Sequence, residues 1–182
     1  MVVVYNASVN KMNVNLKENF IPSLVENPHV ALIELLKIKG LTVSTAESFT
    51  GGNIVSKLTS VSGASAVFYE GIVAYNERAK EQRLGVNKQT LEVFKPVSKE
   101  TAFEMAKGLA SKGNCDLAIS TTGIAGPNSD DSNFPVGLCF IGINFKGDIT
   151  VYSYKLNGNR QEIVNQGTNL AINLAINTIK NI

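Results

Sequence analysis

Apolar and polar positions follow two different periods along this chain of 182 residues. Apolar residues at helical spacing predict helices over residues 28–39, 51–59, 76–84, 88–94, 100–113 and 160–180. Short apolar or alternating runs predict strands over 41–46, within 63–75, and over 115–122, 136–145 and 148–156. Helices and strands alternate at first, and an antiparallel hairpin follows them. The pattern therefore predicts an α/β fold, a three-layer α/β/α sandwich with a mixed, mostly parallel sheet.

Residues 1–20 are rich in Asn and Lys and only weakly patterned. We interpret them as a loosely ordered N-terminal extension, and residues 21–182 as a single domain. The N-terminus has no charged region followed by a long apolar run, and no window approaches the roughly 18 apolar residues of a membrane span. We therefore expect a cytoplasmic protein with no membrane partner.

Charge and composition exclude several classes of function. The net charge is only +2, and Arg78, Arg83 and Arg160 are the only arginines, so we expect no nucleic-acid partner. Cys115 and Cys139 lie in apolar strand-like runs, where buried thiols are the usual finding. With a single histidine, His29, the chain lacks ligands for a typical metal site, and no serine-nucleophile motif lies near His29. We predict no metal and no cofactor.

Two polar loops follow predicted strands, and in open α/β sheets ligands bind at the carboxyl ends of strands. They are AESFTGG, residues 46–52, and TTGIAGP, residues 121–127. Their glycine N–H groups can approach a ligand closely, and the first loop leads into a helix N-terminus that favours negative charge. Such a site can hold a phosphate or the oxyanion of a tetrahedral intermediate. Either loop alone would also suit a structural turn, and neither matches a standard nucleoside-triphosphate or dinucleotide motif.

The segment IVAYNERAK adds candidate catalytic groups. It puts Tyr75 at a strand end and Lys80 one turn into the next helix. A lysine on a helix is usually solvated. Without a usable histidine, however, Ser48, Tyr75 and Lys80 form the most economical hydrolytic set, because a desolvated lysine titrates near neutral pH and can act as a base.

The chain resembles the CinA C-terminal domain family, the nicotinamide-nucleotide amidohydrolases also called PncC. The resemblance lies in TAESFTGG, LTSVSGASAVFYEGIVAYNERAKEQRLGV, PVSKETAFEMAKG, TTGIAGP and FPVG, in this order and spacing. It implies an α/β/α sandwich and metal-free hydrolysis of nicotinamide mononucleotide to nicotinate mononucleotide and ammonia, which returns the pyridine ring to NAD synthesis. It also implies that Ser48 is the nucleophile, with Tyr75 and Lys80 as its activating partners.

The resemblance further implies that Thr122 lines the carboxamide side of the pocket and that Arg160 binds the phosphate, which suits a guanidinium fork. We assign the remaining substrate contacts to the two loops and to the strand end before the first of them: Thr45, Glu47, Gly51, Gly52, Gly123 and Gly126. Glu47 has two further possible roles. It could orient Lys80, or it could serve as an acid at the start of the following helix, which is the commoner role.

The chain departs from the family pattern at Phe49, where Cys is common, and in the acidic loop PNSDDSNF. Many members carry a large N-terminal domain, whereas here the first helix is predicted at residue 28, so we expect the stand-alone form. We also expect a homodimer or a higher homo-oligomer. Two alternatives stay open: a non-catalytic nucleotide-binding or interaction module, and an amidase for another amide on a phosphorylated nucleoside.

Overall fold

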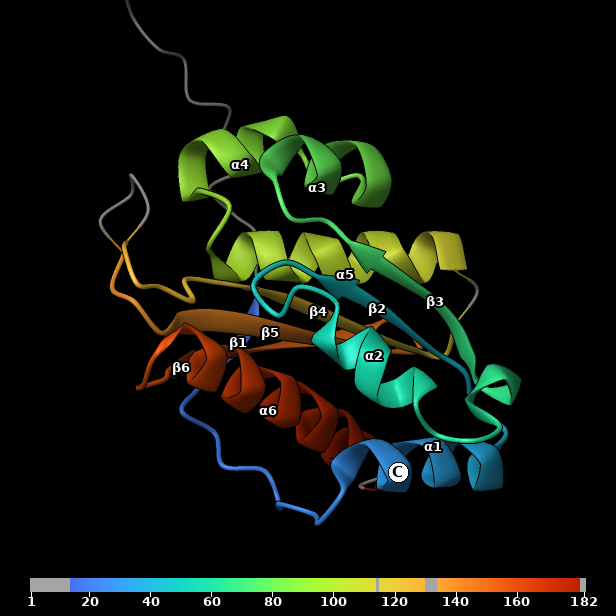
Figure 1. Cartoon of the computed structure of the whole chain (residues 1–182). Coiled ribbons are helices and arrows are strands. Elements are labelled where there is room, and N and C mark those ends of the chain that lie inside the picture. Colours follow the sequence, from blue (N-terminus) through green and yellow to red (C-terminus); the bar gives the residue numbers. More distant parts are fainter. Residues whose placement is uncertain (1–13, 114, 130–133, 181–182) are drawn as a thin grey trace, which may run out of the picture.

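The computed structural model describes residues 14–113, 115–129 and 134–180. A six-stranded sheet of order β1-β6-β5-β4-β2-β3 lies between helices on both of its faces, which confirms the predicted α/β/α sandwich (Figure 1). The strands are β1 (Asn15–Glu18), β2 (Val43–Glu47), β3 (Phe68–Val73), β4 (Leu117–Gly123), β5 (Leu138–Phe145) and β6 (Asp148–Lys155). The α-helices are α1 (Pro28–Lys39), α2 (Asn53–Thr59), α3 (Glu77–Leu84), α4 (Lys88–Phe94), α5 (Lys99–Gly113) and α6 (Arg160–Lys180).

The sheet is mixed because one strand runs against the others. Strands β3, β2 and β4 pair in parallel, β5 pairs antiparallel with both β4 and β6, and β1 pairs in parallel with β6. The carboxyl ends of β2, β3 and β4 therefore meet at one edge of the sheet. Both polar loops leave the sheet at this edge.

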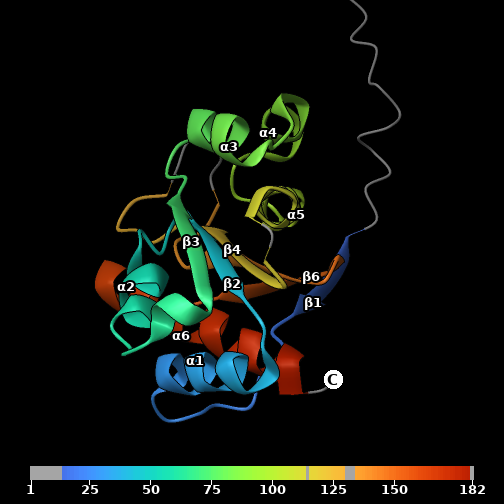
Figure 2. The ribbon, with the colours of Figure 1, turned by 90° about the vertical axis from the view of Figure 1, so that its right-hand side faces the viewer.

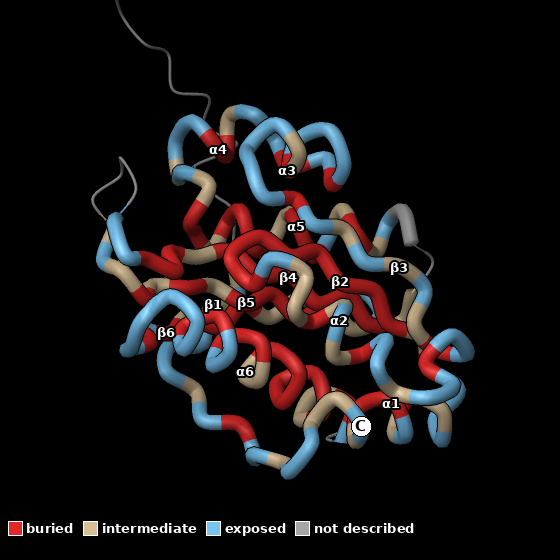
Figure 3. Tube along the Cα trace, in the orientation of Figure 1, coloured by how far each residue is buried: buried red, intermediate tan, exposed pale blue. Residues whose placement is uncertain are grey.

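Helices α1, α2 and α6 cover one face of the sheet, while α5 covers the other with α3 and α4 outside it (Figures 1 and 2). Strand β4 shows why its sequence is apolar without alternation. Leu117 and Ile119 belong to the core cluster that includes α1 and α6, whereas Ala118 packs in the cluster of Met105 and Leu109 of α5. A strand covered on both faces favours an unbroken apolar run, as in residues 117–119 of β4. Figure 3 shows the buried positions concentrated between the layers.

Strand β1 was not expected from the sequence. Residues 15–18 pair with β6, Asn19 N–H donates to Ser153 O at 2.9 Å, and Tyr154 Oη donates to Phe20 O at 2.7 Å. The prediction of a loose segment is therefore wrong for these residues, whose side chains are mostly exposed and carry no alternation. Residues 1–13 lie outside the described residues, and the domain boundary at residue 21 stays a prediction.

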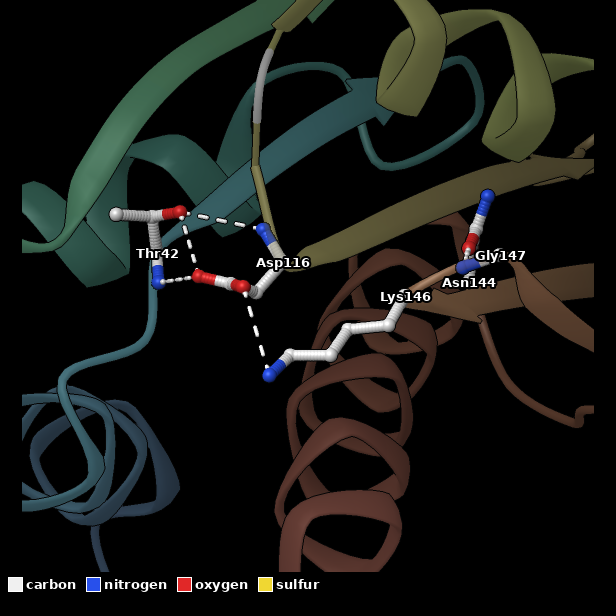
Figure 4. Close-up of polar contacts among 5 residues, drawn as sticks. All are labelled: Thr42, Asp116, Asn144, Lys146 and Gly147. Atoms are coloured by element: carbon white, nitrogen blue, oxygen red, sulfur yellow. Dashed lines mark hydrogen bonds and ion pairs between the residues drawn. The ribbon is translucent and has the colours of Figure 1, made fainter.

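At the amino ends of β2 and β4, one carboxylate joins two strands and a hairpin (Figure 4). Asp116 Oδ2 accepts hydrogen bonds from Thr42 N–H at 2.9 Å and from Thr42 Oγ1 at 3.1 Å. Asp116 Oδ1 lies 3.9 Å from Lys146 Nζ in the turn between β5 and β6, and Lys146 N–H donates to Asp116 O. These contacts fix the register at the end of the sheet opposite the polar loops.

Candidate active site

The two polar loops meet around a cavity of about 270 Å³ at the carboxyl edge of the sheet. The first loop contributes Ser48 and Phe49, the second contributes residues 122–126, and the connection before α5 contributes Pro96 and Val97. Tyr75, Lys80, Asn128, Ser129 and Arg160 complete the lining. The sequence analysis assigned no contact to Pro96, Val97, Asn128 or Ser129, because tertiary packing brings these residues to the cavity. Residues 130–133 of the acidic loop lie outside the described residues.

Ser48 and Lys80 are in direct contact in this cavity. Lys80 Nζ donates to Ser48 Oγ at 2.9 Å and to Ala74 O at 3.1 Å. Lys80 is only 2% exposed and Ser48 is 7% exposed. Burial lowers the pKa of Lys80 from 10.5 to about 8, with an opposing contribution from the nearby Glu77 carboxylate. A substantial fraction of this amine is therefore neutral at mildly alkaline pH, next to a serine hydroxyl.

Backbone hydrogen bonds hold Lys80 in place. The Asn76 side chain accepts from Ala79 N–H at 2.8 Å and caps α3. Ala74, whose carbonyl accepts from Lys80, donates its own N–H to Glu47 O at 2.8 Å. The carboxyl ends of β2 and β3 are thereby tied together, and this link fixes the lysine relative to the serine loop.

Three of the residues that the sequence assigned to substrate binding do not line this cavity: Thr45, Glu47 and Gly52. They are also absent from the lining of a second, adjoining cavity described below. Thr45 is fully buried within the sheet, and its Oγ1 has no hydrogen-bond partner among the described residues. Glu47 is also fully buried, and its carboxylate accepts from the N–H groups of Gly52, Ile54 and Val55 at 2.8–3.0 Å. Of the possible roles for Glu47, the geometry matches the acid at the helix start.

The second loop lies where the sequence predicted. Thr122, Gly123 and Gly126 line the cavity. Thr122 Oγ1 donates to Pro96 O at 2.6 Å. Because a hydroxyl has one proton, Thr122 can offer only acceptor lone pairs to a group in the cavity.

Arg160 and Tyr75 bridge the mouth of the cavity. Arg160 Nη1 donates to Gly126 O at 2.6 Å, and its Nη2 donates to Tyr75 Oη at 2.8 Å. No hydrogen bond joins the Tyr75 hydroxyl to Ser48 or Lys80 in the described part of the chain, and Tyr75 is 58% exposed. The structure thus places Tyr75 beside Arg160 rather than in the Ser48–Lys80 contact.

A second cavity of about 280 Å³ adjoins the first on the other side of this bridge. Both cavities are lined by Phe49, Tyr75 and Arg160, and the second also by Gly51. Lys80 and Arg160 are cationic, and no Asp or Glu among the described residues lines either cavity. The site therefore favours an anionic ligand. Within residues 14–113, 115–129 and 134–180, no three His, Cys, Asp or Glu side chains cluster as metal ligands.

The fold and site define an α/β/α sandwich protein with a buried serine–lysine pair at the carboxyl edge of its sheet. The family model of the CinA C-terminal domain matches residues 26–179. The chain therefore belongs to the CinA C-terminal domain family.

Several curated relatives are similar to the chain. A CinA-like protein of Kosmotoga olearia is 47% identical over 141 residues, which cover 78% of this chain and 34% of the relative. A putative competence-damage inducible protein of Clostridium acetobutylicum is 41% identical over 162 residues, covering 89% of this chain and 39% of the relative. The chain thus spans somewhat more than a third of the length of these relatives.

Solved structures share the fold. A CinA superfamily protein of Klebsiella pneumoniae has a TM-score of 0.84 at 27% identity, covering 87% of this chain and 100% of that chain. A competence/damage inducible protein of Agrobacterium tumefaciens has a TM-score of 0.80 at 33% identity, covering 88% and 99%. None of the described helices is long and apolar enough to cross a membrane.

Proposed function

We propose that the chain hydrolyses the carboxamide of nicotinamide mononucleotide to nicotinate mononucleotide and ammonia. The observation that carries the proposal is the buried contact of Lys80 Nζ with Ser48 Oγ at 2.9 Å. A buried lysine without a carboxylate in contact is unfavourable for folding, so its presence against a serine hydroxyl calls for a chemical reason. Activation of that hydroxyl as a nucleophile supplies one.

In the proposed reaction, neutral Lys80 accepts the Ser48 proton as Oγ attacks the carboxamide carbon, and the C=O electrons move to oxygen. The tetrahedral intermediate collapses, and the leaving nitrogen takes the proton from Lys80 and departs as ammonia. Water then attacks the acyl-serine as Lys80 takes one of its protons, and Lys80 returns that proton to Ser48 Oγ as the acyl–oxygen bond breaks. The acid that is released gives its remaining proton to ammonia, so that the final products are the carboxylate and ammonium. One amide and one water are consumed, so that the protons balance.

The lining of the cavity supports an amide as substrate. Thr122 already donates its hydroxyl proton to Pro96, so it presents an acceptor toward the cavity. An acceptor pairs with the NH₂ group of a carboxamide and repels the carboxylate of the product. We propose that Thr122 selects the amide in this way.

Charge supports a phosphorylated substrate. Arg160 contacts a carbonyl and a hydroxyl, and no carboxylate among the described residues pairs with it. A phosphate would compensate this charge and can accept two parallel hydrogen bonds from a guanidinium. We propose that Arg160 binds the phosphate and that Tyr75 orients Arg160, instead of relaying a proton from Ser48.

The test is ammonia release from nicotinamide mononucleotide by the wild-type chain and by Ser48→Ala. The wild type should release ammonia and the variant should not, while both keep the same melting temperature. Tight binding of the nucleotide without ammonia release from the wild type would instead favour a non-catalytic nucleotide-binding module. Turnover of other phosphorylated amides at higher kcat/KM would move the proposal to a different substrate.

A further inference from the structure

Several backbone N–H groups at the turn between β2 and α2 already have acceptors within the protein. Ser48 N–H donates to Thr121 O, Gly51 N–H to Ser48 O, and Asn53 N–H to Thr50 O. Three further N–H groups at the start of α2, those of Gly52, Ile54 and Val55, donate to the Glu47 carboxylate.

Two consecutive donors of this turn stay unused. The N–H groups of Phe49 and Thr50 donate to no group among the described residues. Backbone N–H groups are rarely left without a partner, and the N–H of the residue after a nucleophile lies close to the carbonyl oxygen that the nucleophile attacks. These two N–H groups can therefore donate hydrogen bonds to the oxyanion. The sequence alone did not indicate which of the two loops would supply such donors.

Glu47 accounts for the conformation of this turn. Gly51 and Gly52 have φ angles of 61° and 94°, and the helix cap at Gly52 has no side-chain acceptor of its own. A residue with a side chain is strained at these angles, so a capping Ser or Asp cannot simply replace Gly52. The Glu47 carboxylate, reaching across from the residue before Ser48, supplies the missing acceptor for the start of α2.

We propose that Glu47 is a positioning residue for catalysis, which fixes the turn of residues 48–52 so that the Phe49 and Thr50 N–H groups face the oxyanion formed when Ser48 attacks. This proposal rests on the proposed function for the identity of the substrate. The role of Glu47 in stabilising the oxyanion does not depend on that identity. The base is held separately, because Lys80 is anchored by Ala74 O and Ala74 by the main-chain carbonyl of Glu47. Replacement of the Glu47 side chain should therefore disturb the oxyanion donors and leave the base in place.

The test compares wild type, Glu47→Gln and a control, Leu58→Val, in two reactions. One is ammonia release from nicotinamide mononucleotide. The other is labelling of Ser48 by an alkyl fluorophosphonate, in which the Ser48 Oγ–P bond forms, the P–F bond breaks, and the serine proton leaves through the base with fluoride. Labelling requires the nucleophile and the oxyanion donors but neither an amide nor a nucleotide.

Glu47→Gln has the same shape, but its NH₂ must face at least one of the three N–H donors. We expect kcat and the labelling rate constant to fall about 10²-fold, the usual loss for a displaced oxyanion donor, with KM within about twofold of wild type. The pH midpoint of labelling should not move, because Lys80 is untouched. Leu58 is fully buried in α2, so Leu58→Val should lower the melting temperature while both rates stay within about twofold.

Rates within about threefold of wild type in Glu47→Gln would overturn the proposal. The proposal would also be overturned if Leu58→Val lost rate in proportion to its lowered melting temperature. A loss of stability alone would then explain the slower rates of Glu47→Gln. If Glu47→Gln does not fold, Glu47→Asp takes its place: it keeps the charge on a shorter side chain and should slow both reactions at least tenfold. Labelling that depends on Glu47 without ammonia release would refute the amidase function and leave this proposal standing.

Discussion

The ring of Phe49 lies against the backbone of Gly167 in the middle of α6. A Cβ at residue 167 would be 2.3 Å from Phe49 Cζ and 2.6 Å from its Cε2, far inside normal contact distances. Phe49 is 4% exposed, so its ring fills the interface between the serine loop and α6. Gly167 therefore leaves the room that the Phe49 ring needs between the serine loop and α6.

Gly167→Ala should destabilise the fold by about 1–3 kcal/mol through overpacking, although alanine is the better helix former. Phe49→Leu replaces the ring by a shorter aliphatic side chain, so the double variant should recover much of the lost stability. Urea denaturation of the four proteins gives the coupling energy between the two sites. Additive effects of the two substitutions would mean that the contact does not limit packing.

The rate of amide hydrolysis should rise with pH through the titration of Lys80. Its pKa is lowered to about 8, so kcat/KM should increase up to roughly that pH and then level off. Lys80→Arg keeps a positive charge but cannot release its proton, so it should lose as much activity as Lys80→Ala. A Lys80→Arg variant with most of the wild-type activity would show that the lysine acts as an electrostatic support.

The lowered pKa of Lys80 should also make the free energy of unfolding rise with pH. Between pH 8 and 10.5 the unfolded chain holds the lysine proton and the folded chain does not, so stability rises with pH in this window. Relative to Lys80→Met, wild type should gain about 2–3 kcal/mol between roughly pH 7 and pH 10. Chemical denaturation of both proteins at the two pH values isolates the lysine, because the other titrating groups are shared.

Tyr75→Phe should raise KM more than it lowers kcat. The hydroxyl accepts from Arg160 Nη2 and makes no hydrogen bond to Ser48 or Lys80, so its loss frees the guanidinium and leaves the hydrogen bonds of the base intact. Arg160→Ala should raise KM further, and neither change should matter for a substrate without phosphate. A selective loss of kcat in Tyr75→Phe would restore the tyrosine to the proton relay.

Asp116→Ala should destabilise the protein by about 2 kcal/mol, because Thr42 N–H loses a charged acceptor and Lys146 its ion partner. Asp148, exposed at the start of β6, provides the control: Asp148→Ala should change stability by less than about 0.5 kcal/mol. Equal effects of the two substitutions would show that the network in Figure 4 adds no stability.

The sequence by itself determined the elements and their order. Helix and strand periods predicted each helix from α1 to α6 and each strand from β2 to β6. Such signals are local, because they arise from neighbours three or four residues apart in helices and from alternation in strands. The same residues also indicated which side chains could carry chemistry. The scarcity of histidine, together with the positions of Ser48, Tyr75 and Lys80 at or after predicted strands, led to the candidate catalytic set of these three residues.

Only the tertiary structure decided how these residues meet. The contact between Ser48 and Lys80 depends on the pairing of β2 with β3, and that between Arg160 and Tyr75 joins residues 85 positions apart. Glu47 was expected at the substrate, but the turn directs its carboxylate into the start of α2. Strand β1 and the fit of Phe49 against Gly167 left no periodic trace in the sequence. They arise from backbone pairing at a sheet edge and from shape complementarity, which depend on segments that become neighbours only when the chain folds.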